Sequence, residues 1–177
     1  MGNKKDFELN IAETSLTIYR LTYLFMPYVF DIRDFKNIHE HYYFSVITEI
    51  LIHLRDLLFK LDAIGNRVDF RDYIEPQPNK GITDITDLIK FYRDAACHNE
   101  SPNRRNSKGY LFSGNVFAAY DFEDDITLLM GDSKLYVKRH LFRLYQTVLQ
   151  RFASYIEFYQ DPNFREALRN GQAQRAI

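Results

Sequence analysis

The segment from His39 to about Ile64 constrains the fold most, because its apolar residues recur at the spacing of one helix face. Polar residues such as Glu49 and Asp56 lie on the opposite face. Gly65 follows directly, and glycine readily adopts the left-handed conformation in which many helices end. We therefore predict one long amphipathic helix that must bury its apolar face against other elements. That face comprises Tyr43, Val46, Ile47, Ile50, Leu51, Leu54, Leu57, Leu58 and Leu61.

Helical spacing predicts three further helices, from about Phe7 to Phe30, from Thr83 to about His98, and from about Lys138 to Tyr159. Pro27 is expected to kink or end the first helix, since proline lacks the N–H that continues a helix. Thr83 is expected to cap the third helix. The expected buried faces contain Leu16, Tyr19, Tyr23 and Met26, widened by Leu21, Leu24 and Phe25, in the first helix; Ile85, Leu88, Ile89 and Tyr92 in the third; and Leu141, Leu144, Tyr145, Val148, Phe152, Tyr155, Ile156 and Tyr159 in the fourth.

The stretch between the third and fourth helices has the pattern of strands. Val116 to Tyr120 predicts one strand, and ITLLM-GDS-KLYV predicts a hairpin with its turn at Gly131-Asp132. We therefore expect an all-α fold, a four-helix up-and-down bundle with a small β-hairpin insertion between helices three and four. A single domain is expected over residues 1–160, followed by a polar C-terminal tail over residues 161–177.

Charge and cysteine content limit the function. A net charge of −1 over 177 residues excludes a global basic field, so any contact with nucleic acid must come from a local patch. The single cysteine, Cys97, excludes an intramolecular disulfide and favours a reducing, cytoplasmic compartment. We expect no membrane partner, because the N-terminus lacks the apolar core of a signal peptide and the longest apolar run is too short to cross a bilayer. No metal-ligand spacing is found, and no cofactor is expected.

The stretch RDAACH, Arg93 to His98, closes the third expected helix and is the main candidate site. Asp94 and His98 are four residues apart, which places them on one face of a helix, so Asp94 is expected to hydrogen-bond and orient the imidazole. An imidazole held in this way exchanges protons near neutral pH. Arg93 has no acidic residue three or four positions away, so its guanidinium is expected to be available for a phosphate.

A short basic loop follows this stretch. Arg104, Arg105 and Lys108 are candidates for contact with RNA, although a solvated turn explains them equally well. Tyr92 and Tyr110 are near this loop in sequence and are candidates for stacking on an RNA base.

Arg93 to His98, near the end of the third helix of a helical bundle, resembles the R-x4-6-H signature of the HEPN superfamily (higher eukaryotes and prokaryotes nucleotide-binding domain). A second match, Arg33 to His39, falls in the connector between the first two helices, where the family does not place the motif. The resemblance implies a metal-independent endoribonuclease that acts as a homodimer, with two motifs facing one cleft. It also implies the toxin of a toxin–antitoxin or phage-defence system, with a possible antitoxin of nucleotidyltransferase type.

The resemblance also assigns roles to the motif residues. Arg93 would bind the scissile phosphate, His98 would act as general base or acid, and Asp94 would orient His98. The products would be a 2′,3′-cyclic phosphate and a 5′-OH, since the ribose 2′-OH is the nucleophile and no metal is needed. The alternative is a non-catalytic HEPN-like module that binds a nucleotide, an RNA or a protein, in which the motif is an ordinary helix end. A plain helical scaffold is the third possibility.

Three other features have structural interpretations. Glu49, His53 and Asp56 recur at helical spacing in the second expected helix, and an exposed helix face explains them better than a site does. The tyrosine-rich stripes of the first and fourth helices are expected to serve the core and a dimer interface. Cys97 is expected to be a small packing residue rather than a nucleophile.

Overall fold

The chain is mostly helical and carries a small antiparallel sheet, as the sequence indicates. The computed structural model describes residues 10–26, 41–98, 100–105, 118–122, 125–153 and 155. The elements are α1 (Ile11–Leu24), α2 (His41–Ala63), α3 (Ile85–Cys97), β1 (Ala118–Phe122), β2 (Asp125–Met130), β3 (Ser133–Tyr136) and α4 (Arg143–Phe152). A π-helical segment, Val137–Phe142, leads into α4.

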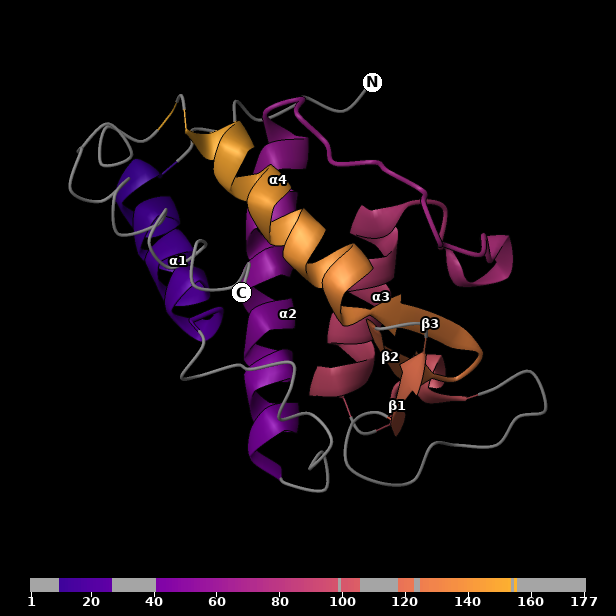
Figure 1. Ribbon diagram of the computed structural model, residues 1–177. Coiled ribbons are helices and arrows are strands. Elements are labelled where there is room, and N and C mark those ends of the chain that lie inside the picture. The colour runs from indigo at the N-terminus through magenta and orange to yellow at the C-terminus, as the bar shows by residue number, and fades with distance from the viewer. Residues whose placement is uncertain are drawn as a thin grey trace.

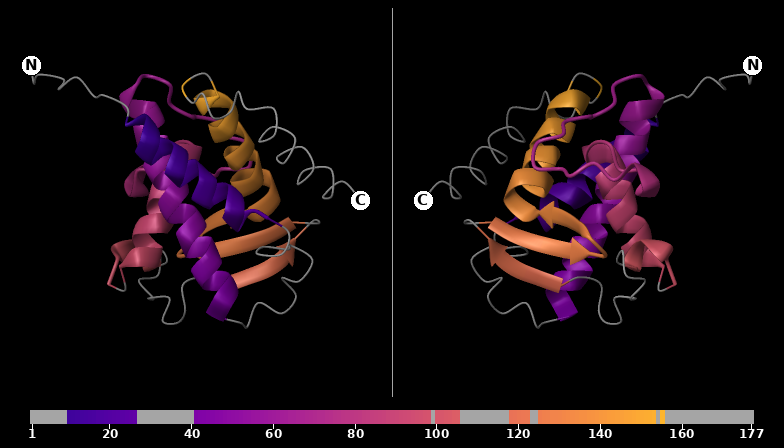
Figure 2. Two further views of the ribbon diagram at one scale, coloured as in Figure 1. Left: turned by 90° about the vertical axis from the view of Figure 1, so that its left-hand side faces the viewer. Right: turned by 90° about the vertical axis from the view of Figure 1, so that its right-hand side faces the viewer.

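Helix α2 is the centre of the fold. It packs between α1 and α3, and α4 crosses it (Figure 1). Figure 2 shows α4 and the strands together on one side of α2, with α3 toward the other side. The predicted apolar face of α2 is confirmed from Val46 to Leu61, where its aliphatic side chains are buried. The expected end of α2 is confirmed as well: Gly65 has φ 78°, and the N–H of Asn66 donates to the Leu61 carbonyl oxygen at 2.8 Å.

The buried face of α1 differs from the expected one. Leu21, Leu24 and Phe25 are buried as expected, whereas Leu16, Tyr19 and Tyr23 are exposed. Threonines take the place of those three residues in the core. Each threonine hydroxyl donates to the carbonyl oxygen four residues earlier in its own helix, so burial leaves it satisfied and presents its methyl group to the core. The buried set is Thr14, Thr17, Ile18, Leu21, Thr22 and Leu24.

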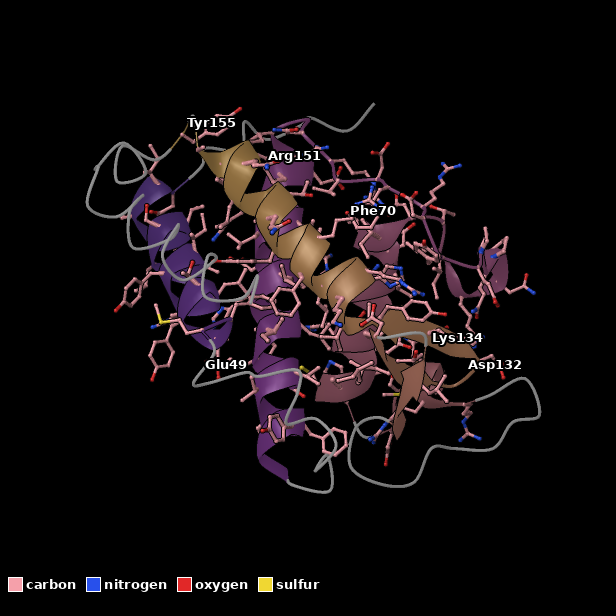
Figure 3. The ribbon with its side chains drawn as sticks, in the orientation of Figure 1. Glu49, Phe70, Asp132, Lys134, Arg151 and Tyr155 are labelled. Atoms are coloured by element: carbon pink, nitrogen blue, oxygen red, sulfur yellow. The ribbon has the colours of Figure 1, made fainter. Side chains whose placement is uncertain are left out.

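Helix α3 begins at an aspartate and is tied to α2 by an arginine. Asp84, rather than the expected Thr83, is the N-cap, and its carboxylate accepts from the N–H of Asp87. Arg67, just after α2, donates to the carboxylates of Asp84 and Asp87. Arg151, near the end of α4, donates to the carbonyl oxygens of Asn66 and Arg67 at 2.8 and 2.6 Å (Figure 3). These bonds join the ends of three helices.

The strands form an antiparallel meander in the order β1–β2–β3. The predicted hairpin is confirmed, and its turn contains Gly131 with φ 59°. The strand expected from Val116 to Tyr120 is found over residues 118–122 and pairs with β2, so the insertion is a three-stranded sheet. The hydroxyl of Tyr92 in α3 lies 2.7 Å from the Leu128 carbonyl oxygen and 2.6 Å from that of Ser133, which fixes the sheet against α3.

The last helix starts differently from the prediction. Its first turn, Val137–Phe142, is π-helical, and the buried carboxylate of Asp125 accepts from the N–H groups of Lys138 and Arg139 at 2.7 and 2.9 Å. This carboxylate satisfies N–H groups that have no partner inside the helix. The end expected near Tyr159 lies outside the described residues.

His140 is fully buried in the π-helical segment and is neutral. Its Nδ1 accepts from the N–H of Tyr136, and its Nε2 lies 3.1 Å from the carbonyl oxygen of Asp72, which requires the proton on Nε2. Burial lowers the pKa of His140 to about 4, against the opposing charge of Asp125.

The Tyr92→Phe substitution tests the link between α3 and the sheet. The two carbonyl oxygens lose the single buried hydroxyl proton that they share, so the free energy of unfolding should fall by about 1–2 kcal/mol. Urea unfolding measures this loss. Tyr73→Phe is the control, because Tyr73 is 63% exposed and should change stability little. Equal effects of the two substitutions would contradict the proposed link.

His140 should make stability depend on pH. Between pH 6.5 and about 4 the unfolded histidine binds a proton that the folded one does not, so stability falls as the pH decreases. The slope from one group is at most about 1.4 kcal/mol per pH unit. His140→Gln, which retains a donor for the Asp72 carbonyl, should reduce the stability difference between pH 7 and pH 5 in urea unfolding. His98→Gln, which removes an exposed imidazole, is the control. An unchanged difference in His140→Gln would refute this account.

Candidate functional site

An open groove of about 520 Å³ lies between α1, α2 and α3. Its lining residues recur at helical spacing on each of the three helices, so one stripe from each helix faces it. The lining contains no residue of α4 or of the described strands. The stripes are Glu13, Leu16, Thr17 and Arg20 from α1; Ile52, His53, Arg55, Asp56 and Phe59 from α2; and Lys90, Arg93 and Asp94 from α3.

The structure brings together two of the three predicted catalytic residues. Arg93 and Asp94 are half-buried in the groove wall, and Arg93 Nη1 donates to Asp94 Oδ1 at 3.0 Å. The expectation that Arg93 has no acidic partner is therefore wrong. Helical spacing pairs residues three or four positions apart, whereas this partner is the adjacent residue.

His98 is not part of this cluster. Helix α3 ends at Cys97, and His98 has the extended conformation φ −127°, ψ 108° with an exposed side chain. The four-residue spacing places two side chains on one face only within a helix. Among the described residues no hydrogen bond joins Asp94 to His98, so the expected orienting role of Asp94 is not found.

Only some of the residues predicted to contact RNA lie on the surface. Tyr92 is 0% exposed and Arg104 is 6% exposed, so neither presents its side chain to a ligand, and these two expectations are wrong. Arg105 is exposed. Lys108 and Tyr110 lie outside the described residues, as do Arg33 and His39 of the second motif match.

The basic loop is instead held against the hairpin turn. A Cβ at Gly131 would approach the carbonyl oxygen of Arg105 to 2.7 Å, closer than real Cβ contacts come. Only glycine permits this approach together with a φ of 59°. The backbone of residues 103–105 therefore packs on the turn.

His53 is the main groove residue that was not predicted to belong to a site. It was expected on an exposed helix face, yet its side chain is only 12% exposed and lines the groove floor. Its Nε2 is shielded from solvent and lies 3.7 Å from Glu49 Oε1 (Figure 3 labels Glu49), beyond hydrogen-bond distance. Burial lowers the pKa of His53; Glu49 opposes the shift and Arg20 adds to it. Glu49 is exposed as expected, whereas His53 and Asp56 line the groove.

The acidic residues of the groove already have partners. Lys60, buried below α1, donates to Asp56 at 2.7 Å and to Glu13 at 3.2 Å, and Asp94 accepts from Arg93. Within the described part of the chain, the positively charged side chains of the groove have fewer ion-pair partners than the acidic ones. The Arg55 guanidinium lies 5.7 Å from the centre of the Phe59 ring. Arg20 and Lys90 form no ion pair with any described residue and are exposed at the groove rims. The groove therefore has a local excess of positive charge.

The described residues contain no group of three or more His, Cys, Asp or Glu side chains placed to hold a metal ion. None of the helices in that same part of the chain is long and apolar enough to cross a membrane. Comparisons with protein-family models, with curated proteins and with solved structures gave no match. The candidate functional features are therefore the groove and the Arg93–Asp94 pair in its wall.

Lys60→Met tests how α1 is held beside the groove. The substitution removes two charge-assisted hydrogen bonds, but Asp56 and Glu13 are partly exposed and regain water, so we expect a loss of about 1–2 kcal/mol in the free energy of unfolding. Urea unfolding measures it. Lys134→Met is the matched control, because the exposed Lys134 lies 4.0 Å from Glu75 and such pairs contribute little. A loss no larger than that of the control would show that the buried pair does not hold α1.

Proposed function

We propose that the protein is a metal-independent endoribonuclease of HEPN type that cleaves RNA to 2′,3′-cyclic phosphate and 5′-OH ends. The observation that carries the proposal is the position of Arg93 in the wall of an open groove with excess positive charge. RNA is a polyanion, and phosphate contacts by arginine and lysine dominate its affinity for proteins. A groove open to solvent also admits a chain that continues beyond the bound nucleotide.

In the proposed mechanism Arg93 binds the scissile phosphate. Its bond to Asp94 uses one guanidinium nitrogen and restricts the side chain, and the guanidinium has five N–H donors in all. Asp94 is thus a positioning residue for Arg93, which replaces its expected role toward His98. Charge that develops on the phosphate oxygens in the transition state is stabilised by the remaining donors.

His98 acts as general base on the 2′-OH or as general acid on the leaving 5′-oxygen. Its side chain is exposed and therefore accessible to RNA. In a homodimer the two copies would divide these roles. The chemistry needs no metal, because the nucleophile belongs to the substrate.

The proposal includes a HEPN-like four-helix bundle, a homodimer and a possible nucleotidyltransferase-type antitoxin. Exposed apolar residues of α1 outside the groove support a protein partner, since exposed apolar side chains favour association. They are Ile11, Tyr19 and Tyr23.

One observation favours the second candidate, a non-catalytic HEPN-like module that binds a nucleotide, an RNA or a protein. His98 has no hydrogen-bond partner within the described part of the chain that would fix its tautomer. A catalytic histidine is usually oriented by such a partner. The groove would then bind its ligand without cleaving it.

RNA cleavage by the purified protein in excess EDTA tests the proposal. Arg93→Ala and His98→Ala should each lower the rate by at least about a hundredfold, as loss of a transition-state donor or of an acid–base group does. Arg71→Ala, an exposed arginine outside the groove, is the control and should retain activity. Circular dichroism confirms folding of each variant.

Cyclic phosphate ends that disappear in both motif variants would support the nuclease. Equal activity in the wild type and both motif variants would place the activity elsewhere. Binding of RNA without cleavage by the wild type would favour the module.

A further inference from the structure

We propose that the groove between α1, α2 and α3 binds a phosphate group beside Arg20 and Lys90, and that this binding is coupled to uptake of a proton by His53. The inference goes beyond the proposed nuclease, because it requires neither His98 nor cleavage of RNA. It rests on two observations. Arg20 and Lys90 have no ion pair among the described residues, and the imidazole of His53 is largely buried in the groove floor.

The two cations come from opposite walls. Arg20 belongs to α1 and Lys90 to α3, with α2 between the two helices (Figure 1). Both side chains are exposed, and neither forms an ion pair within the described ranges. Arg93 differs, since Asp94 already engages it. An anion in the groove would be attracted by a cation on each rim, and neither cation has an ion pair to break within the described ranges.

The other acids in the groove do not compete for these cations. Asp56 and Glu13 share the buried Lys60, at 2.7 and 3.2 Å. An anion that approaches Arg20 therefore meets carboxylates that are already paired. The apolar side chains of Leu16, Ile52 and Phe59 line the same groove and offer a surface for the organic part of a phosphate-bearing ligand.

His53 lies in the floor of this groove with an unsatisfied nitrogen. Its Nε2 is shielded from solvent and has no hydrogen-bond partner among the described residues. Glu49 Oε1 is 3.7 Å away, which is an ion-pair distance once Nε2 is protonated, and a small movement would bring the two atoms within hydrogen-bond distance. The charged groups on the three helices around His53 are Glu49, Arg55, Asp56 and Lys60 on α2, Glu13 and Arg20 on α1, and Lys90, Arg93 and Asp94 on α3.

An anion bound in the groove favours the protonated form of His53. Burial lowers the pKa of this imidazole, and the positive charge of Arg20 lowers it further. A bound anion offsets the charge of Arg20 and Lys90 and adds a negative charge of its own, so the pKa of His53 rises. By linkage the protonated protein binds the anion more tightly, so affinity increases as the pH falls. The proton comes from solvent.

The test follows the histidine signals of the full chain by NMR during a pH titration, in sulfate and in chloride at equal ionic strength. Sulfate is the probe because it has the shape of phosphate and keeps its charge over the range in which histidine titrates. In the wild type the pKa of His53 should be higher in sulfate than in chloride. His53→Gln identifies the signal.

Arg20→Gln and Lys90→Gln should each weaken sulfate binding roughly tenfold to a hundredfold, as loss of a charge-assisted hydrogen bond does. They should also reduce the response of His53. Arg71→Gln is the control, since Arg71 is exposed and outside the groove. Equal pKa values of His53 in sulfate and chloride, or a full response in the Arg20→Gln and Lys90→Gln variants, would overturn the proposal.

Two probes distinguish the source of the phosphate. A 2′-O-methyl oligoribonucleotide cannot be cleaved by attack of its own 2′-oxygen, and it is compared with and without a 5′-phosphate as a competitor of sulfate. Stronger competition by the phosphorylated form would identify a terminal phosphate, and equal competition would identify the backbone diester. Failure of both to displace sulfate would overturn the claim that the groove takes a phosphate group. Because no cleavage is measured, the outcome is independent of the nuclease proposal.

Discussion

Packing around α2 determines where a ligand can bind to the described part of this protein. The aliphatic face of α2 is buried against its neighbours, and α4 crosses the helix while α1 and α3 flank it (Figure 1). The polar stripe of α2 that carries His53 and Asp56 is left as the floor of a groove with α1 and α3 as walls. One amphipathic helix therefore creates both the core and the candidate site, and the ion pair of its Lys60 with Glu13 joins it to the α1 wall.

Much of the fold follows from patterns in the sequence, where one physical effect dominates. The face of α2, its glycine end and the hairpin turn were predicted because burial of large aliphatic residues and a positive φ leave few alternatives. The buried face of α1 was not predicted correctly, because the two sides of this helix are similar in hydrophobicity. Leu16, Tyr19 and Tyr23 look like a core stripe, and only hydroxyl bonds within the helix make Thr14 and Thr17 suitable for burial.

The candidate site was harder to predict because it depends on where a helix ends and on how three helices meet. Pairing of Asp94 with His98 required one more helical residue than α3 has. Tyr92 was assigned both to an apolar face and to base stacking, and its buried hydroxyl between two strand carbonyls shows that the first assignment is correct. The role proposed for His53 depends on residues from other helices, since Arg20 and Lys90 are distant in sequence. No single-helix pattern contains that information.

The central claim is that a phosphate-bearing ligand binds in the groove of α1, α2 and α3. Mapping the backbone amide shifts caused by a non-cleavable 2′-O-methyl oligoribonucleotide tests it most directly. The account predicts that the largest changes fall on residues 13–20 and 90–94, which form the two walls, and on residues 52–59, which form the floor. Changes confined to the hairpin and to residues 100–105, with the groove helices unaffected, would contradict it.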